Sequence, residues 1–231
     1  MKTIGILGGL GPGAGAQLYQ NIINQAQSVY SAHEDDEHPP VVLHTTALSG
    51  FDAAASLTNP DTKQELLTAL QGIEAAGADF VVIACNTVHL LYDELQARLN
   101  MPLLHLIKEV VRVIPQDCKT VGVLSSAQST NESLYSHFLK QAGINVLTPT
   151  AKQQDRITQV ISTVMAGTHG VPEKNVLEAI MADLHQKGAE MVVLGCTELP
   201  LAVSPEDISG IPIIDSLDVA AGVCLARALQ S

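Results

Sequence analysis

The chain alternates short apolar runs with longer segments of helical spacing. The first apolar runs are TIGILGG (3–9), which ends in glycines, PVVLHTTA (40–47) and DFVVIA (79–84). Between them, AGAQLYQNIINQAQSVY (14–30) and TKQELLTALQGIEAAG (62–77) carry apolar residues at helical spacing. The same alternation continues after residue 119, so the pattern predicts strands and helices in regular succession.

The sequence also repeats itself over a long period. Three segments recur in the same order with nearly constant offset. The pairs are KTIGILGG (2–9) with KTVGVLSS (119–126), GADFVVIACNT (77–87) with GAEMVVLGCTE (188–198), and MPLLHLI (101–107) with IPIIDSL (211–217). Each copy of the second pair contains one cysteine at the same place, directly after its apolar run.

Strands that are apolar on both faces and joined by helices indicate parallel pairing with right-handed crossovers. We therefore predict an α/β fold of two similar lobes related by a pseudo-twofold axis, each a parallel four-stranded sheet flanked by helices. The first lobe is predicted over residues 1–105, completed by a C-terminal helix over 216–231, and the second over 106–215. Ligands of open α/β sheets bind beyond the carboxyl ends of the strands, so the active site is expected between the lobes.

Composition narrows the classes of function. The 231 residues carry a net charge of −12 and only 12 lysines and arginines, which are scattered singly. This argues against nucleic acid and anionic membranes as partners. The acidic run at 34–37 is expected in a solvated loop, and no apolar run reaches the roughly 18 residues that a membrane span needs. We expect a cytosolic protein whose N-terminus is a strand rather than a signal peptide.

The paired cysteines, Cys85 and Cys196, are the main candidates for chemistry. Each follows an apolar strand and precedes a predicted helix start, whose free N–H groups are expected to lower the pKa of a thiol and to bind a carboxylate. Two groups on opposite faces of one carbon suit stereoinversion, in which one thiolate removes the α-proton and the other thiol supplies one. Such a reaction requires no pyridoxal phosphate. Cys118 and Cys224 are expected in the core, and no cysteine or histidine spacing suggests a metal site.

These residues resemble motifs of the aspartate/glutamate racemase family. CNTVH (85–89) and GCTELPL (195–201) are similar to its two cysteine motifs, and KTIGILGGLGP (2–12) to its opening. The similarity extends over essentially the whole chain. It implies two α/β lobes, racemisation of amino acids without a cofactor, an isomerase that is commonly a homodimer, and Cys85 and Cys196 as the acid/base pair.

The resemblance also implies a substrate site. The residues matching the family's contacts to the α-carboxylate and amine are Leu10, Asn86, Thr87, Ser126 and Thr197. Two further contacts differ, because Asp52 and Met165 stand where aspartate racemases commonly have an arginine and a lysine for the side-chain carboxylate. An acidic residue there would repel an anion by about 1–4 kcal/mol at 4 Å in wet surroundings. A neutral or cationic substrate side chain therefore fits better than aspartate.

Other functions remain open from the sequence. Gly9, Gly11 and Ala14 loosely fit a dinucleotide fingerprint, but PVVLHTTA lacks the acidic residue expected for the ribose. A non-catalytic binder of small carboxylates, a hydantoin racemase and a maleate isomerase are alternatives, whereas an arylmalonate decarboxylase uses a single cysteine. His89, His105 and His137 are interpreted as structural. Glu198 is expected to orient the neighbouring thiol or to cap its helix.

Overall fold

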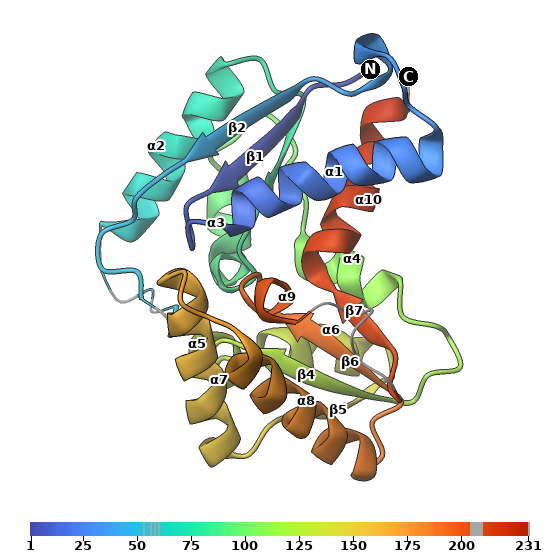
Figure 1. The fold of residues 1–231 in the computed structure, drawn as a ribbon. Helices are drawn as coiled ribbons and strands as arrows, with labels where there is room; N and C mark the ends of the chain where they lie inside the picture. The colour runs from blue at the N-terminus through green and yellow to red at the C-terminus, as the bar shows by residue number, and fades with distance from the viewer. Residues whose placement is uncertain (53, 56, 58, 60, 204–209, 231) are drawn as a thin grey trace.

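Two parallel β-sheets organise the chain, one in each half of the sequence (Figure 1). The structure is a computed structural model and describes residues 1–52, 54, 55, 57, 59, 61–203 and 210–230. The first sheet has the order β2-β1-β3. Its strands are β1 (Ile4–Gly8), β2 (Val41–Thr45) and β3 (Phe80–Ile83). The second has the order β5-β4-β6-β7. Its strands are β4 (Thr120–Ser125), β5 (Asn145–Leu147), β6 (Met191–Gly195) and β7 (Ile213–Asp215).

The predicted α/β fold with two lobes is confirmed, with one difference in strand number. Where the first lobe was expected to have a fourth strand, the described residues form a single parallel bridge between Val81 and Leu103. The carbonyl of Pro102 accepts a hydrogen bond from Val81, as the carbonyl of Pro212 does from Val192 beside β7. The first lobe therefore keeps the start of this pairing but not a full strand.

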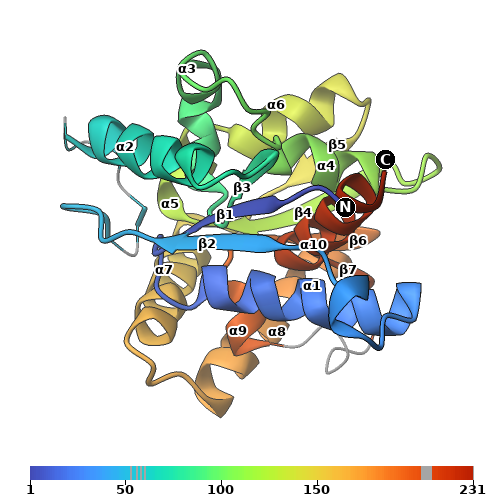
Figure 2. The ribbon, with the colours of Figure 1, turned by 90° about the horizontal axis from the view of Figure 1, so that it is seen from above.

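Helices flank both sheets (Figure 2). In the first half of the chain they are α1 (Ala14–Tyr30), α2 (Thr62–Ala75), α3 (Tyr92–Gln96) and α4 (Leu106–Arg112), with the 3-10 segments η1 (Asp35–Glu37) and η2 (Thr87–Leu91). In the second half they are α5 (Ala127–Asn131), α6 (Leu134–Gln141), α7 (Ala151–Met165), α8 (Val171–Gln186), α9 (Leu199–Ala202) and α10 (Ser216–Leu229).

The last helix, α10, leaves the second lobe and packs on α1 of the first (Figure 1). The N–H of Lys2 donates to the carbonyl of Ala228 at 2.9 Å, and the Gln25 amide donates to a carboxylate oxygen of Asp218 at 2.5 Å. The helix predicted over 216–231 thus lies against the first lobe, although residue 231 is outside the described part of the chain. The lobe limits at 105 and 215 stay a prediction.

The apolar core is divided by the two sheets. One cluster contains residues of both lobes and of α10, among them Ile6, Val123 and Leu225. Two further clusters lie on the opposite sheet faces, one with Cys85 under α2 and one with Cys196 under α7 and α8. Because side chains alternate along a strand, each central strand contributes to a cluster on both of its faces. The shared cluster fixes one lobe on the other.

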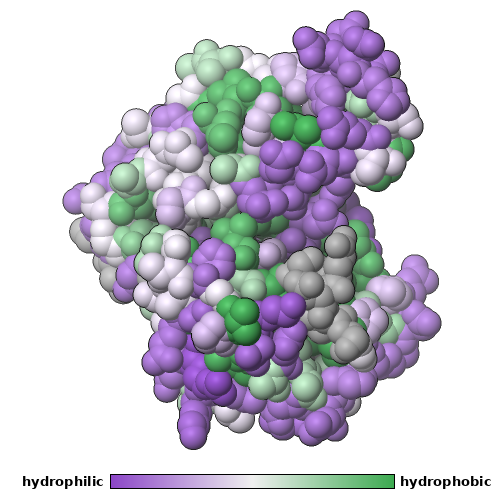
Figure 3. Space-filling model, viewed as in Figure 1, coloured by the Kyte–Doolittle hydropathy of each residue, from purple (hydrophilic) through white to green (hydrophobic). Residues whose placement is uncertain are grey.

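The surface agrees with the charge pattern of the sequence. The acidic residues 34–37 are all exposed, as predicted. Figure 3 shows that hydrophilic residues dominate the surface over this end of the first lobe, while the apolar residues form separate small patches. Within the described ranges, no helix is long and apolar enough to cross a membrane.

Gly5 and Gly122 occupy the same position in the two repeats and provide a matched test of packing. A Cβ on Gly5 would lie 2.5 Å from a methyl of Ile73 and 3.0 Å from the carbonyl oxygen of Phe80. A Cβ on Gly122 would lie 3.1 Å from a methyl of Leu184. We expect Gly5→Ala to lower the free energy of unfolding by about 1–3 kcal/mol, and Gly122→Ala to lower it less. Denaturant unfolding measures both, and an equal or larger loss for Gly122→Ala would contradict the packing.

Candidate active site

Both repeat cysteines line one cavity, at the carboxyl ends of β3 and β6. The cavity has a volume of about 280 Å³, which includes its opening to solvent. Its lining residues are Leu10, Gly11, Phe51, Asp52, Ala55, Cys85, Asn86, Thr87, Ile161, Met165, Cys196, Thr197 and Glu198. The two thiols are close enough that the charge of Cys85 raises the pKa of Cys196, after burial and Glu198. Two sulfur atoms from separate lobes therefore face one small space.

Most residues predicted for the site lie in this cavity. The exception is Ser126, which is not part of the lining and reaches the cavity only through a hydrogen bond of 2.8 Å to the Thr87 hydroxyl. The side chain of Asp52 accepts a hydrogen bond of 3.1 Å from the N–H of Ala54, and the residue is exposed. Phe51, Ala55 and Ile161 were not predicted. No motif marks them, since they enter through the loop after β2 and one face of α7.

Cys85 is surrounded by hydrogen-bond donors. The N–H groups of Val88 and Thr87 and the Thr87 hydroxyl all favour its thiolate, as the predicted helix start implied. Burial nevertheless dominates and, with a smaller effect from Glu198, raises the pKa of Cys85 to about 12. The expectation of a lowered thiol pKa is therefore wrong for the unliganded site. Burial destabilises the thiolate by more than these hydrogen-bond donors stabilise it.

Cys196 has an acceptor instead of donors as its closest side-chain partner. Its Sγ donates a hydrogen bond of 3.1 Å to Oε2 of Glu198, a carboxylate that is only 5% exposed. Burial and then Glu198 raise the pKa of Cys196 well above its usual value. The interpretation that Glu198 orients the neighbouring thiol is confirmed. Its alternative role as a cap is not, since the side chain makes no capping bond to α9.

Glu198 also connects the lobes. Its Oε1 accepts a hydrogen bond of 3.0 Å from the N–H of Gly11, in the loop that follows β1. A Cβ on Gly11 would lie 2.7 Å from that oxygen, so the close approach requires glycine. The Thr197 hydroxyl donates to Oε2 at 3.0 Å. One buried carboxylate thereby binds a thiol of the second lobe and the backbone of the first.

Asn86 and Thr87 are polar residues of the first lobe that contact side chains of the second lobe. The Thr87 hydroxyl lies 2.8 Å from that of Ser126 and 3.0 Å from that of Ser129, both at the start of α5. Asn86 accepts a hydrogen bond of 2.6 Å from the Tyr135 hydroxyl and donates one of 3.1 Å to Ser216. These buried side chains are fixed before any ligand binds, as a preorganised site requires.

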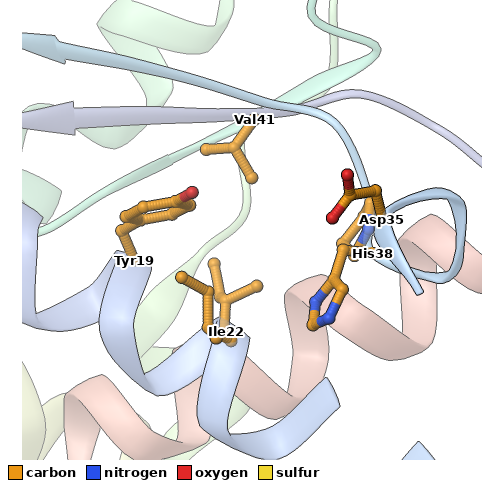
Figure 4. A pocket seen from close by; sticks show the side chains of 7 residues that line it. Tyr19, Ile22, Asp35, His38 and Val41 are labelled. Carbon is orange, nitrogen blue, oxygen red and sulfur yellow. The ribbon is translucent and has the colours of Figure 1, made fainter. Parts of the chain in front are cut away.

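Two other cavities are larger but hold no cysteine. One lies beside α1 and encloses about 570 Å³, with Tyr19, Ile22 and Val41 facing Asp35 and His38 (Figure 4). The second encloses about 630 Å³ and is lined by histidine, lysine and aromatic residues of η2, α3, α4 and α6. Neither brings a nucleophile to an oriented base, so the cysteine cavity is the candidate active site.

Within the described part of the chain, no group of three or more histidine, cysteine or acidic residues could hold a metal.

His89 and His105 hold backbone groups beside the site. Nδ1 of His89 lies 2.9 Å from the carbonyl of Cys85, and its Nε2 accepts from the N–H of Leu106. Nδ1 of His105 accepts from the N–H of Lys108 at the start of α4. Burial lowers the pKa of both histidines, that of His105 to about 3. Both rings are therefore neutral and structural at physiological pH.

Comparison with known proteins identifies the family of the chain. The family model described as Asp/Glu/Hydantoin racemase matches residues 7–224. A broad specificity amino-acid racemase of Bacillus subtilis is 28% identical over 228 residues, which cover 99% of this chain and 96% of the relative.

Solved structures show the same fold. An aspartate racemase homologue from Pyrococcus horikoshii has a TM-score of 0.79 and 25% identity, with 99% of each chain covered. The Picrophilus torridus aspartate racemase has a TM-score of 0.84 and 24% identity, covering 99% of this chain and 94% of its own. The protein is thus an isomerase of the racemase class. It belongs to the Asp/Glu/Hydantoin racemase family.

The buried neutral histidines predict how stability depends on pH. The folded pKa of His105, about 3, lies below the unfolded value near 6.5, so the unfolded state takes up a proton first as pH falls. Stability is then lost below about pH 6.5, by up to roughly 1.4 kcal/mol per pH unit for each such histidine. We expect His105→Asn, which can still accept the Lys108 N–H, to make this slope shallower in denaturant unfolding between pH 6.5 and 4.5. His137→Asn, at an exposed position on α6, is the control, and an unchanged slope in His105→Asn would refute the assignment.

Proposed function

We propose that this chain interconverts the L- and D-forms of an amino acid by proton transfer between the α-carbon and the thiols of Cys85 and Cys196. The observation that carries the proposal is the shared cavity, which is lined by one cysteine of each lobe together with the polar side chains of Asn86, Thr87 and Thr197. Family membership supports the reaction class, and the geometry supports the choice of acid and base.

In the proposed reaction, one thiolate removes the α-proton on one face and the opposite thiol delivers a proton on the other. The electron pair left on the α-carbon is delocalised into the substrate carboxylate, which needs hydrogen-bond donors. Asn86, Thr87 and Thr197 line the same cavity as the two cysteines and are assigned to bind the carboxylate and the amine. Ser126 supports this set through the Thr87 hydroxyl. Because the reaction runs both ways, each cysteine serves as base for one enantiomer and as acid for the other.

The charges of the cavity support a neutral or cationic substrate side chain. Asp52 and Glu198 are its ionisable carboxylates, and no lysine or arginine is among the described residues that line it. Met165, at the end of α7, provides an apolar contact where a cation would be needed for an acidic side chain. Two negative charges about 4 Å apart repel by roughly 1–4 kcal/mol in wet surroundings. Aspartate and glutamate are therefore poorer candidates than lysine-like or uncharged amino acids, and the name of the B. subtilis relative also points to a wide range of substrates.

The setting of the enzyme is part of the proposal. All four cysteines are free thiols in the structure, and a cytosolic location would keep them reduced. A homodimer is proposed from the family resemblance, and its mass in solution would test it.

A second candidate is a related racemisation or isomerisation of a small acid. The description of the matching family includes hydantoin racemases, and two facing cysteines would serve such a ring, or maleate, as well as an amino acid. The discriminating measurement is incubation in deuterated water with L- and D-amino acids, hydantoins and maleate, scored for α-deuterium and loss of chirality. Exchange with hydantoins or maleate alone would replace the amino-acid proposal.

Replacement of either cysteine tests the two-base reaction. We expect Cys85→Ser and Cys196→Ser each to lower racemisation by at least about 10³-fold, because a serine hydroxyl is a far weaker acid than a thiol and cannot take its place. Loss of optical rotation measures the rate. Cys118→Ser, a buried cysteine outside the cavity, is the matched control and keeps its activity. Full activity in either site variant would exclude the mechanism.

Asp52→Asn tests the choice of substrate side chain. Without the charge of Asp52, the cavity repels the anionic side chain of aspartate less and attracts the cationic side chain of lysine less. We expect the ratio of kcat/KM for aspartate to that for lysine to rise by about five- to tenfold, as for a partly exposed charge. Competition between the two amino acids under racemising conditions measures the ratio. Asp61→Asn, on the same loop but outside the cavity lining, should leave it unchanged, and an unchanged ratio in Asp52→Asn would place Asp52 outside the substrate's reach.

A further inference from the structure

We infer that the two cysteines ionise in a fixed order: when the pair loses its first proton, Cys85 becomes the thiolate and Cys196 stays a thiol, and Glu198 is the positioning residue that sets this order. The inference rests on the proposed function and deepens it, since it states which cysteine becomes the base first and therefore which enantiomer meets an active base first.

The partners of the two sulfur atoms differ in kind. Two backbone N–H groups, of Val88 and Thr87, and the Thr87 hydroxyl act on Cys85 in the direction that favours its thiolate. Donors of this kind stabilise an anion and offer little to a thiol. Cys196 has one such donor, the backbone N–H of Glu198, and it donates its own proton to the Glu198 carboxylate at 3.1 Å. A thiolate at Cys196 would lose that bond and bring two negative charges together, so removal of the first proton from Cys85 costs less free energy.

The asymmetry arises at one position of an otherwise repeated sequence. Thr87 and Glu198 each stand two residues after their cysteine, in GADFVVIACNT and GAEMVVLGCTE. A hydroxyl can donate to the sulfur, whereas a carboxylate accepts from it. Glu198 is also held by Gly11 and Thr197, which prevents it from turning away from Cys196.

The other groups around the pair do not reverse this order. The hydroxyl of Tyr135 interacts electrostatically with Cys196 but donates its proton to Asn86. Asp52 lies on the wall of the same cavity and adds a further negative charge. None of the described residues that line the cavity is a lysine or arginine that could stabilise a thiolate on the Cys196 side.

The proton balance of one turnover follows. For the enantiomer whose α-hydrogen faces Cys85, the C–H bond breaks as an S–H bond forms on Cys85. The S–H bond of Cys196 then breaks as its proton bonds to the opposite face of the α-carbon, leaving a thiolate beside Glu198. After product release a proton must pass from Cys85 to Cys196 to restore the form that began the turnover. The other enantiomer reacts with the form in which Cys196 is the thiolate and Cys85 is the thiol. The proton transfer from Cys85 to Cys196 removes that form.

Steady-state efficiency cannot reveal this difference. The two enantiomers have equal free energy, so their kcat/KM values must be equal whatever the order of ionisation. The ionisation of each thiol has to be measured directly. The exchange of the substrate α-proton with solvent has to be measured in variants that keep only one of the two cysteines.

The first test follows the alkylation of each cysteine by iodoacetamide, read by peptide mass spectrometry in the absence of substrate. Glu198→Gln keeps an acceptor for Gly11 but removes the charge beside Cys196. We expect alkylation of Cys196 at pH 8 to become at least about tenfold faster, as for a pKa lower by one unit, and that of Cys85 to change less. Cys118 and Cys224 in the same digests control for loosening of the fold. Equal acceleration of both site cysteines, or no acceleration of Cys196, overturns the role of Glu198.

The second test uses α-proton exchange in deuterated water. Cys196→Ser keeps Cys85 and should still exchange the α-proton of one enantiomer, while Cys85→Ser should exchange neither. Adding Glu198→Gln to Cys85→Ser should restore exchange for the other enantiomer, by at least about tenfold over Cys85→Ser alone. Exchange by Cys85→Ser comparable to that by Cys196→Ser overturns the assignment of Cys85 as the cysteine that ionises first. If the unmodified enzyme exchanges no amino acid, the proposed function fails, and the alkylation experiment still decides the ionic states.

Discussion

On the proposed function, the chemistry depends on holding two sulfur atoms, carried by two separate sheets, in one cavity of about 280 Å³. A small shift of one lobe would separate them, so the lobes must be fixed to each other. The apolar core contributes to this, because one cluster contains residues of both lobes and of α10. Around the cavity, two hydrogen bonds cross between the lobes: the N–H of Gly11 donates to Glu198, and the hydroxyls of Thr87 and Ser126 bond to each other. The same side chains that follow the cysteines in sequence thus set their separation.

This arrangement has an electrostatic cost. Burial and a nearby carboxylate raise the pKa of both site thiols, so the unliganded pair holds its protons. An amino acid brings an ammonium group into a cavity whose described lining offers only negative charges. A positive charge beside a buried thiol lowers its pKa. On the proposed function, the substrate therefore supplies the charge that activates its own base, and the thiols stay unreactive until it binds.

Much of this could be predicted from the sequence because the repeat carries the topology. Matching segments at β1 and β4, and at β3 and β6, predicted two parallel sheets with a cysteine at equivalent strand ends. Burial could not be predicted in the same way. A helix start after each cysteine suggested a lowered thiol pKa. The pKa of both thiols is instead raised, because burial depends on how the two lobes close over the site. Ser126 illustrates a second limit, since its motif is shared with the family but its hydroxyl is bound by Thr87.

The repeat also shows where the lobes have diverged. Asp79 and Glu190 are equivalent, and each accepts hydrogen bonds from the backbone at the start of the neighbouring central strand. His105 and Asp215 likewise accept a backbone N–H at the starts of α4 and α10.

Burial favours the neutral form of both capping groups, because it lowers the pKa of His105 to about 3 and raises that of Asp215 to about 6. The two lobes therefore use different side chains at this position, because the backbone N–H requires only a hydrogen-bond acceptor. At Thr87 and Glu198 the two copies differ in a group beside the cavity thiols, and on the proposed function this difference changes the chemistry. Two repeats of one fold can thus keep the same geometry while the proposed acid/base groups become unequal.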